Sequence, residues 1–221
     1  NPWEFERPEV TYDIGFGGRV EPRGNNGQKF AWRPSEHVVA VAYDTPVPGW
    51  RGNRVNTLRL WSARPAAPMQ FEEFNRGQYL DAFAEQVKAT NISRVLYPDD
   101  STPAGQELRL KQEYFFVSAS LQDLVRRHLS AYGTIATLPR AAAIQLNDTH
   151  PALVVPELIR ILIDDHGFAL RTALELTRNT VAYTNHTLLP EALESWPVQL
   201  LERLLPRHMQ IIYQINATHL E

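Results

Sequence analysis

The chain of 221 residues contains no cysteine, and this absence excludes a disulfide framework and thiolate metal sites. No stretch approaches the roughly 18 apolar residues of a membrane helix, so we expect no membrane partner. The formal net charge of -3 leaves no basic surplus, so we expect no nucleic-acid partner. The first ten residues, NPWEFERPEV, lack the apolar core of a signal peptide. These absences fit a reducing cytosol, and we expect a cytoplasmic protein.

The residues that are present can build a core, since 43% of them are hydrophobic. In the first third an alternation with a period of two predicts strands at 10–16, 37–43 and 55–61. Turn-forming residues separate these strands at 21–28 and 44–53. On length alone we expect one domain, with a mainly β part at 1–66 and an α/β part at 67–221.

From residue 71 the apolar period changes to 3.6. This period predicts a helical region at 71–90, a short apolar link at 91–98 and a long helix at 106–129. On the long helix Arg109 precedes Glu113 by four residues, and Asp123 precedes Arg127 by the same spacing. Such pairs are typical of a solvated outer face.

The second half alternates strands and helices. An apolar strand is expected at 141–146 and a helix at 151–165, closed by Gly167. Another helix is expected at 168–178 and a strand at 180–183. Pro190, Pro197 and Pro206 each stand near the start of a helical segment, where a missing N–H costs little. The pattern predicts an α/β arrangement.

Two polar turns interrupt these apolar segments, at 145–151 (QLNDTHP) and at 182–194 (AYTNHTLLPEALE). Each follows a predicted strand and opens a predicted helix, which is where an open α/β sheet gathers its ligand contacts. Asp148 or Thr149 is suited to cap the helix that Pro151 opens. A cap does not account for His150, so a binding site and a cap with a backbone-bonded histidine both remain open.

The second turn carries Asn185 and His186, with Glu191 and Glu194 expected one or two turns into the following helix. Amides, imidazoles and carboxylates at strand ends suit a polyhydroxylated ligand, because they match the donors and acceptors of sugar hydroxyls. No HExxH spacing accompanies the histidines, so we expect no metal site. The chain also lacks the GxSxG motif of a serine hydrolase.

Several long strings resemble one known family. They lie at 43–63 (YDTPVPGWRGNRVNTLRLWSA), 91–100 (NISRVLYPDD), 107–127 (ELRLKQEYFFVSASLQDLVRR), 145–151 and 183–216. In this order they are similar to the α-glucan phosphorylases, which act on glycogen, starch and maltodextrin. The resemblance runs over the whole chain, from Asn1 to Glu221.

The resemblance implies a fold and an activity. Enzymes of this family are cytosolic homodimers with two Rossmann-like domains of the glycosyltransferase-B type, and their pyridoxal phosphate is held by a lysine of the C-terminal domain. They use phosphate to release the terminal glucose of an α-1,4-glucan as glucose 1-phosphate. Residues 1–221 would then form an internal part of the N-terminal domain, and the cofactor lysine would lie outside them. We expect this part to bind no cofactor and to be inactive alone.

The resemblance also implies roles for particular residues. His186 resembles the histidine whose imidazole holds a glucosyl hydroxyl, and Asp148 resembles the aspartate that supports it, so both are implied as catalytic residues. Asp100 resembles an acid on a gating loop beside the phosphate subsite. The residues similar to the substrate-binding lining are Asp100, Arg109, His150, Asn185, Thr187, Glu191 and Ala192.

Two departures separate the chain from the regulated animal enzymes. Ser101, Thr102 and Pro103 stand where those enzymes carry aromatic rings that stack purine-like inhibitors. Arg126 and Arg127 resemble arginines of a nucleotide site, but no matching adenine loop follows them. We therefore expect a bacterial-type enzyme. Two alternatives remain, a carbohydrate-binding or regulatory module without catalysis and a nucleotide-sugar glycosyltransferase of the same fold.

Overall fold

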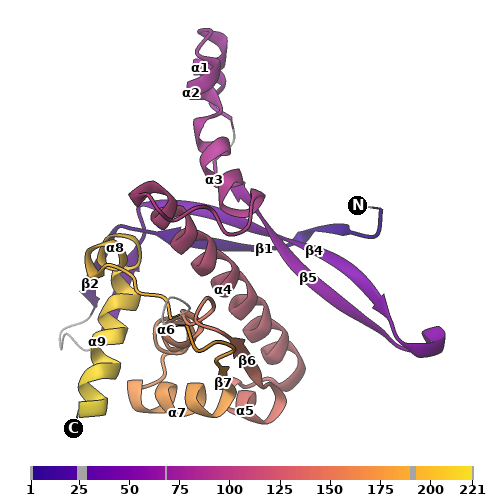
Figure 1. The fold of residues 1–221 in the computed structure, drawn as a ribbon, viewed down its shortest axis with the longest axis vertical. Helices are drawn as coiled ribbons and strands as arrows, with labels where there is room; N and C mark the ends of the chain where they lie inside the picture. The colour runs from indigo at the N-terminus through magenta and orange to yellow at the C-terminus, as the bar shows by residue number, and fades with distance from the viewer. Residues whose placement is uncertain (1, 24–28, 68, 190–192, 221) are drawn as a thin grey trace. The chain divides into compact units, whose positions relative to one another are not determined.

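The computed structural model describes residues 2–23, 29–67, 69–189 and 193–220. The chain divides into two compact units. The first unit consists of Asn1–Gly15 and His37–Ala119, and the second of Phe16–Glu36 and Ser120–Glu221. Both contain helices and strands, so the expected α/β class is confirmed in its coarse form (Figure 1).

The first unit is built on a three-stranded sheet of order β1-β4-β5, in which β1 is Phe5–Phe16, β4 is Glu36–Pro48 and β5 is Val55–Pro65. β4 and β5 are antiparallel, from Val38↔Pro65 to Pro48↔Val55. All three predicted strands are confirmed, and each extends beyond its predicted bounds. The buried apolar residues of the sheet are Ile14, Phe16, Val38, Ala40, Val41, Ala42, Trp61 and Ala63.

Three short helices follow the sheet, α1 (Phe71–Asn75), α2 (Tyr79–Ala82) and α3 (Ala84–Arg94). The predicted helical region is therefore correct but interrupted twice, and the predicted link at 91–98 begins too early because α3 continues to Arg94. The hydroxyl of Ser93 accepts a hydrogen bond from the backbone N–H of Ala63 at 2.9 Å, which fixes the end of α3 to β5.

The long predicted helix is confirmed as α4, Pro103–Tyr132. Its expected solvated charge face holds only for Arg127, whose side chain is 69% exposed. Asp123 is buried, and Arg126 Nη2 donates to its carboxylate at 3.0 Å, while the side chains of Arg109 and Glu113 are only 18% and 10% exposed. The i,i+4 spacing predicts which charges meet along a helix, but it does not predict how many sides of the helix are covered.

The second unit contains a hairpin that the sequence pattern missed, β2 (Arg19–Arg23) paired with β3 (Lys29–Arg33). Residues 21–23, expected as turn, lie in β2. Pro22 suggested a turn, because proline has no N–H to donate to a neighbouring strand. Proline is nevertheless tolerated in an edge strand, where its nitrogen faces away from the partner strand. A two-stranded hairpin offers such an edge.

The remainder of the second unit places two short parallel strands beside each other. β6 (Ile144–Asn147) pairs with β7 (Val181–Thr184), from Ile144↔Val181 to Asn147↔Thr184. Between them run α6 (Val154–Arg160), the π-helical turn η3 (Ile161–Asp165) and α7 (Leu170–Thr180). The expected strand at 141–146 starts late, because η2 (Ile135–Thr137) and α5 (Leu138–Ala141) precede it. Gly167 ends the π-helical turn as predicted, with φ 73°.

Two helices end the chain, α8 (Val198–Leu204) and α9 (Pro206–Leu220). Pro197 caps α8 and Pro206 opens α9, as predicted, whereas Pro190 lies outside the described residues. Glu194 does not lie in a helix, because the described residues before α8 are irregular. Among the helices of the described ranges, none is long and apolar enough to cross a membrane.

Candidate functional site

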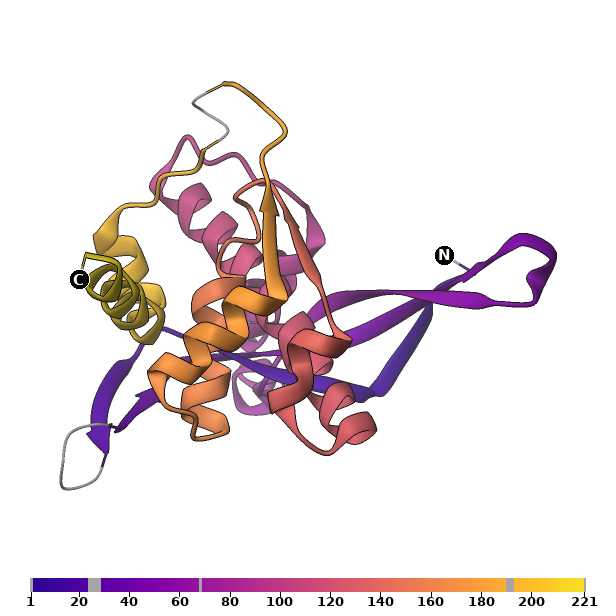
Figure 2. The same ribbon diagram turned by 90° about the horizontal axis from the view of Figure 1, so that it is seen from below.

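The two polar turns meet at the carboxyl ends of β6 and β7. Because these strands are parallel and paired, their ends lie at one edge of the sheet, and Figure 2 shows them side by side. The backbone N–H of Asp148 donates to Thr184 O at 2.9 Å, so the ladder continues one residue into the first turn. This edge is where open α/β sheets bind ligands.

Asp148 connects the two turns through its side chain. Its Oδ1 accepts a hydrogen bond from the backbone N–H of His186 at 3.1 Å. The backbone of Asp148 has φ 61°, a left-handed conformation that aspartate and asparagine tolerate better than most residues. The turn therefore aims the carboxylate across the strand ends at the start of the second turn.

The imidazole of His186 is exposed and has one partner on β6. Its Nε2 lies 3.3 Å from Oδ1 of Asn147. When Nε2 carries the ring proton and donates to Asn147, Nδ1 becomes an acceptor. A ligand hydroxyl that donates to Nδ1 would be recognised by this arrangement.

The second turn is ordered by its own side chains. Asn185 Oδ1 accepts from the N–H of Thr187 at 3.2 Å, and Thr187 Oγ1 accepts from the N–H of Leu189 at 3.1 Å. Such local bonds are the usual way in which Asn and Thr shape a turn. The backbone on both sides of His186 is thus fixed.

The expected helix cap is wrong. α6 starts at Val154 with Leu153 at its N-cap, and no side chain caps it. Thr149 instead accepts from the N–H of Glu194 at 3.3 Å, and His150 is half buried. The side chains of Asp148 and Thr149 therefore bond the second turn.

A second pair of candidate residues lies in the first unit. Arg109 Nη1 donates to Asp100 Oδ2 at 2.8 Å, and Arg109 Nε lies 3.4 Å from Glu113 Oε1. The side chain of Asp100 is 49% exposed and that of Arg109 18%. The guanidinium also lies 5.9 Å from the ring centroid of Tyr97.

The structure thus brings the candidates together in two groups, one in each unit. Asp148, His150, Asn185, His186 and Thr187 belong to the second unit, and Asp100 and Arg109 to the first. Glu191 and Ala192 lie outside the described residues. Within the described part of the chain, no three His, Asp or Glu side chains converge on a point that could hold a metal ion.

The sequence placed Gln145 and Asn147 in the first polar turn but gave no role to either residue. Asn147 orients the His186 ring, and Gln145 Nε2 donates to Thr184 Oγ1 at 2.5 Å across the two strands. Both residues belong to the same polar string as Asp148, QLNDTHP, and that string is the feature of the sequence that could have indicated them.

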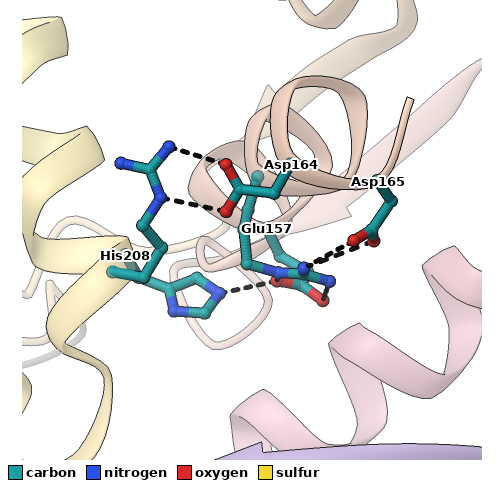
Figure 3. Close-up of polar contacts among 6 residues, drawn as sticks. Glu157, Asp164, Asp165 and His208 are labelled. Carbon is teal, nitrogen blue, oxygen red and sulfur yellow. Dashed lines mark hydrogen bonds and ion pairs between the residues drawn. The ribbon is translucent and has the colours of Figure 1, made fainter. Parts of the chain in front are cut away.

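The sequence also gave no sign of a buried ionic cluster between α6, η3 and α9, formed by Glu157, Arg160, Asp164, Arg207 and His208. His208 Nε2 lies 2.6 Å from Glu157 Oε2, and Arg160 binds the same carboxylate at 2.7 and 3.0 Å (Figure 3). Arg207 binds Asp164 through two hydrogen bonds of 2.9 and 2.7 Å. The cluster fixes α6 and η3 to α9, and α6 is the helix that follows Asp148.

The electrostatics of the buried pair follow from its surroundings. Burial alone would raise the pKa of Glu157, but Arg160 and His208 together outweigh burial and hold the pKa well below its ordinary range. Burial lowers the pKa of His208, although Glu157 opposes that shift. The carboxylate is therefore ionised at any ordinary pH.

Comparison with known proteins identifies similar sequences over the full chain. The model of the carbohydrate phosphorylase family matches residues 1–221. Glycogen phosphorylase of Haemophilus influenzae is 51% identical over 220 residues, covering 100% of this chain and 26% of that protein. The brain form of glycogen phosphorylase from Rattus norvegicus and the liver form from Homo sapiens are each 52% identical over 229 residues, covering 100% of this chain and 27% of each relative. The chain thus spans about a quarter of the length of these relatives.

Proposed function

Because this chain belongs to the carbohydrate phosphorylase family, we propose that it works within an α-1,4-glucan phosphorylase and supplies the part of the cleft that holds the terminal glucose. The observation that carries the proposal is the hydrogen bond from His186 to Asp148 at the ends of two parallel strands. In the full-length enzyme the reaction is the phosphorolysis of the terminal glucose to glucose 1-phosphate. Its substrates are an α-1,4-glucan and phosphate.

His186 and Asp148 have separate tasks in this proposal. The His186 imidazole is oriented by Asn147, and its Nδ1 accepts a hydrogen bond from a hydroxyl of the terminal glucose. The backbone carbonyl of His186 faces the positive charge that develops at the anomeric carbon in the transition state. Asp148 fixes the backbone of that residue through its N–H. A preformed position for the histidine matters because misplacement by about 1 Å can cost 100-fold in rate.

Asp100 and Arg109 are assigned to the phosphate side of the cleft. A carboxylate near a phosphate subsite opposes phosphate by charge repulsion, so its position controls phosphate binding. Arg109 partly neutralises Asp100 at 2.8 Å. We further propose that His150, Asn185, Thr187, Glu191 and Ala192 line the substrate channel.

The family implies pyridoxal phosphate, and neither Lys88 nor Lys111 is placed to hold that cofactor. On α3, Lys88 Nζ binds Glu85 at 2.8 Å, and both side chains are exposed. On α4, Lys111 Nζ lies 3.6 Å from Glu107, and both side chains are partly exposed. Each of these two lysines is thus paired with a glutamate of its own helix. We propose that the cofactor lysine belongs to another part of the full-length polypeptide, in the second Rossmann-like domain of a glycosyltransferase-B fold.

The proposal has consequences for the chain taken alone. Without the domain that carries the cofactor and the phosphate-binding groups, the 221 residues should not catalyse phosphorolysis. The full-length protein should be a cytoplasmic homodimer.

Replacement of His186 in the full-length enzyme tests the proposal. We expect His186→Ala to lower kcat/KM for glucose 1-phosphate formation by about 100-fold or more, since a positioned contact to the reacting sugar is lost. The control is His219→Ala, which removes an exposed histidine near the end of α9. Wild-type protein that forms no glucose 1-phosphate from glycogen and phosphate would refute the function.

A further inference from the structure

A cavity of about 410 Å³ lies within the second unit, among the β2–β3 hairpin, η3, the start of α7 and α9. Its volume falls in the range of small-molecule pockets, about 300–1,000 Å³. Six side chains that line it are charged, aromatic or amide groups, namely Arg23, Phe30, Asp164, Phe168, Arg207 and Gln214. The cavity is therefore large enough for an organic ligand and has polar groups to orient one.

Two of the lining charges neutralise each other. Arg207 is 1% exposed and binds Asp164 through two hydrogen bonds of 2.9 and 2.7 Å, which Figure 3 shows. Its Nη1 donates to Gln210 at 2.6 Å, and its guanidinium lies 5.0 Å from the ring centroid of Phe30. Arg207 and Asp164 thus shape the wall of the cavity without adding net charge to it.

Arg23, at the end of β2, is the cation that remains. Because two arginines and one aspartate line the cavity, its described side chains carry a net charge of +1. Arg23 is exposed, and within the described ranges its side chain makes no hydrogen bond or ion pair. The adjoining residues 24–28, GNNGQ, include no acid that could neutralise it. The charge of the cavity therefore favours an anionic ligand.

The register of the β2–β3 hairpin places a second cation opposite Arg23. Arg19 pairs with Arg33, and Arg23 pairs with Lys29. Like charges directly opposite each other destabilise a hairpin. Glu21 compensates the first pair, because its carboxylate lies 2.6 Å from Arg19 and 3.9 Å from Arg33. No described carboxylate pairs with Arg23, so the end of the hairpin at the cavity keeps a positive charge that a bound anion would offset.

The remaining walls of the cavity offer other recognition groups. The 11-residue helix α7 begins at Leu170 without a side-chain cap, so its first N–H groups add to the attraction for an anion. Phe168 supplies an aromatic surface. The Gln214 side chain, which makes no hydrogen bond within the described ranges, supplies an amide donor and acceptor for ligand hydroxyls.

We propose that this cavity binds a phosphate ester of a monosaccharide, with the phosphate at Arg23 and the start of α7 and the sugar hydroxyls at Gln214. A guanidinium binds two phosphate oxygens at once, and the cavity leaves room for a sugar beside Phe168. Inorganic phosphate alone would leave the amide and the aromatic wall without a partner. The site uses neither His186 nor a cofactor, so it lies beyond the proposed function and stands or falls independently of it.

Hydrogen exchange in the full-length protein tests the site. Galactose 6-phosphate is the probe, because it is neither substrate nor product of the proposed reaction. We expect it to protect the amides of 163–172 in a saturable manner, and the concentration dependence gives the Kd. In Arg23→Ala the Kd should rise at least about 10-fold, since the charge-assisted bonds to phosphate are lost.

Two further variants control for charge and folding. Arg19→Ala removes an exposed arginine of the same strand that does not line the cavity, and its Kd should stay within about twofold of the wild-type value. Arg23→Lys keeps the charge without the guanidinium fork, so it should retain part of the affinity. Because Arg23 is exposed, all three variants should melt within a few degrees of the wild type.

The two halves of the ligand are separated by simpler probes. Galactose should not protect 163–172 at concentrations at which its phosphate ester does, because it lacks the anion. Inorganic phosphate should bind more weakly than the ester, because it does not reach Gln214. Gln214→Ala should accordingly raise the Kd for galactose 6-phosphate several-fold and leave that for inorganic phosphate unchanged.

Several results would overturn the proposal. The first is an absence of protection at 163–172 by galactose 6-phosphate, and the second is equal protection in the wild type and in Arg23→Ala. Equal affinity for galactose would mean a site for neutral sugars, and equal affinity for inorganic phosphate would mean a site for the free ion. Saturable protection that depends on both Arg23 and Gln214 supports the proposal, whether or not the enzyme shows phosphorolysis.

Discussion

The Glu157 carboxylate and the His208 imidazole lie 2.6 Å apart in the second unit, and both side chains are fully buried. The pair joins α6 to α9, and Arg160 is a second partner of the same carboxylate. Two buried groups of this kind depend on each other, because loss of one leaves the other without its partner in a medium that does not solvate it.

We predict that Glu157→Ala lowers the free energy of unfolding by about 3–5 kcal/mol, the range for breaking a buried ion pair. Arg160 and His208 would remain without the carboxylate that both of them contact. Urea denaturation gives the value. Glu175→Ala is the control, since Glu175 faces Arg171 in an exposed pair of 3.5 Å and should change stability little. Equal effects of the two variants would contradict the prediction.

Acidification is predicted to destabilise the fold through His208. Burial lowers its pKa, so below the ordinary value of about 6.5 the unfolded chain takes up a proton that the folded chain resists. The contribution of neutral His208 to the free energy of unfolding is therefore fully present above about pH 6.5 and is lost as the pH falls below it. The lowered pKa of Glu157 acts in the same direction, but only below about pH 4.3. We expect Tm to fall between about pH 7 and 5.5, and His208→Asn to flatten that slope.

Three substitutions at Asp148 separate its backbone role from its carboxylate role. Asp148→Asn keeps an acceptor for the His186 N–H and tolerates φ 61°, so it should retain most of the stability and of kcat/KM. Asp148→Gly accepts the backbone conformation but removes the acceptor. Asp148→Ala loses the acceptor and adds about 1–2 kcal/mol of left-handed strain. Thermal melting should therefore rank alanine below glycine, while both variants lose activity alike.

Removal of the charge on Asp100 is predicted to favour phosphate. In the full-length enzyme, Asp100→Asn should lower the KM for phosphate, because repulsion between the carboxylate and phosphate disappears. Its stability should change by less than about 1 kcal/mol, since the ion pair with Arg109 is half exposed. A raised KM for phosphate would show instead that Asp100 helps to bind the substrate.

Periodicity predicted most of the elements, and the errors have identifiable causes. The long helix α4 and the strands β1, β4 and β5 carry strong patterns over many residues. The hairpin β2–β3 was missed because Pro22 and the neighbouring polar residues look like a turn in isolation. Burial of Asp123 was missed because a sequence shows the spacing of charges but not what packs around them.

The candidate site could be predicted in its residue types but not in its bonds. Asp148 and His186 were expected to act together, and the structure brings them within 3.1 Å. The orienting amide of Asn147 and the partnership of Glu157 with His208 depend on tertiary contacts between distant segments, which no local pattern encodes. Asp148 or Thr149 was expected as a helix cap because capping is a common use of both residue types before a helix. In the structure their side chains accept hydrogen bonds from His186 and Glu194 of the second turn instead.

The parallel pairing of β6 with β7 sets the order in which this site can form during folding. The whole of α6, η3 and α7 lies between the two strands, so Asn147 and His186 meet only after that crossover has closed. Contacts between such distant segments form slowly, because closing the loop between them costs conformational entropy before the contacts contribute any stability. During synthesis the first turn leaves the ribosome well before its partner, and the histidine acquires its position only when the second strand arrives.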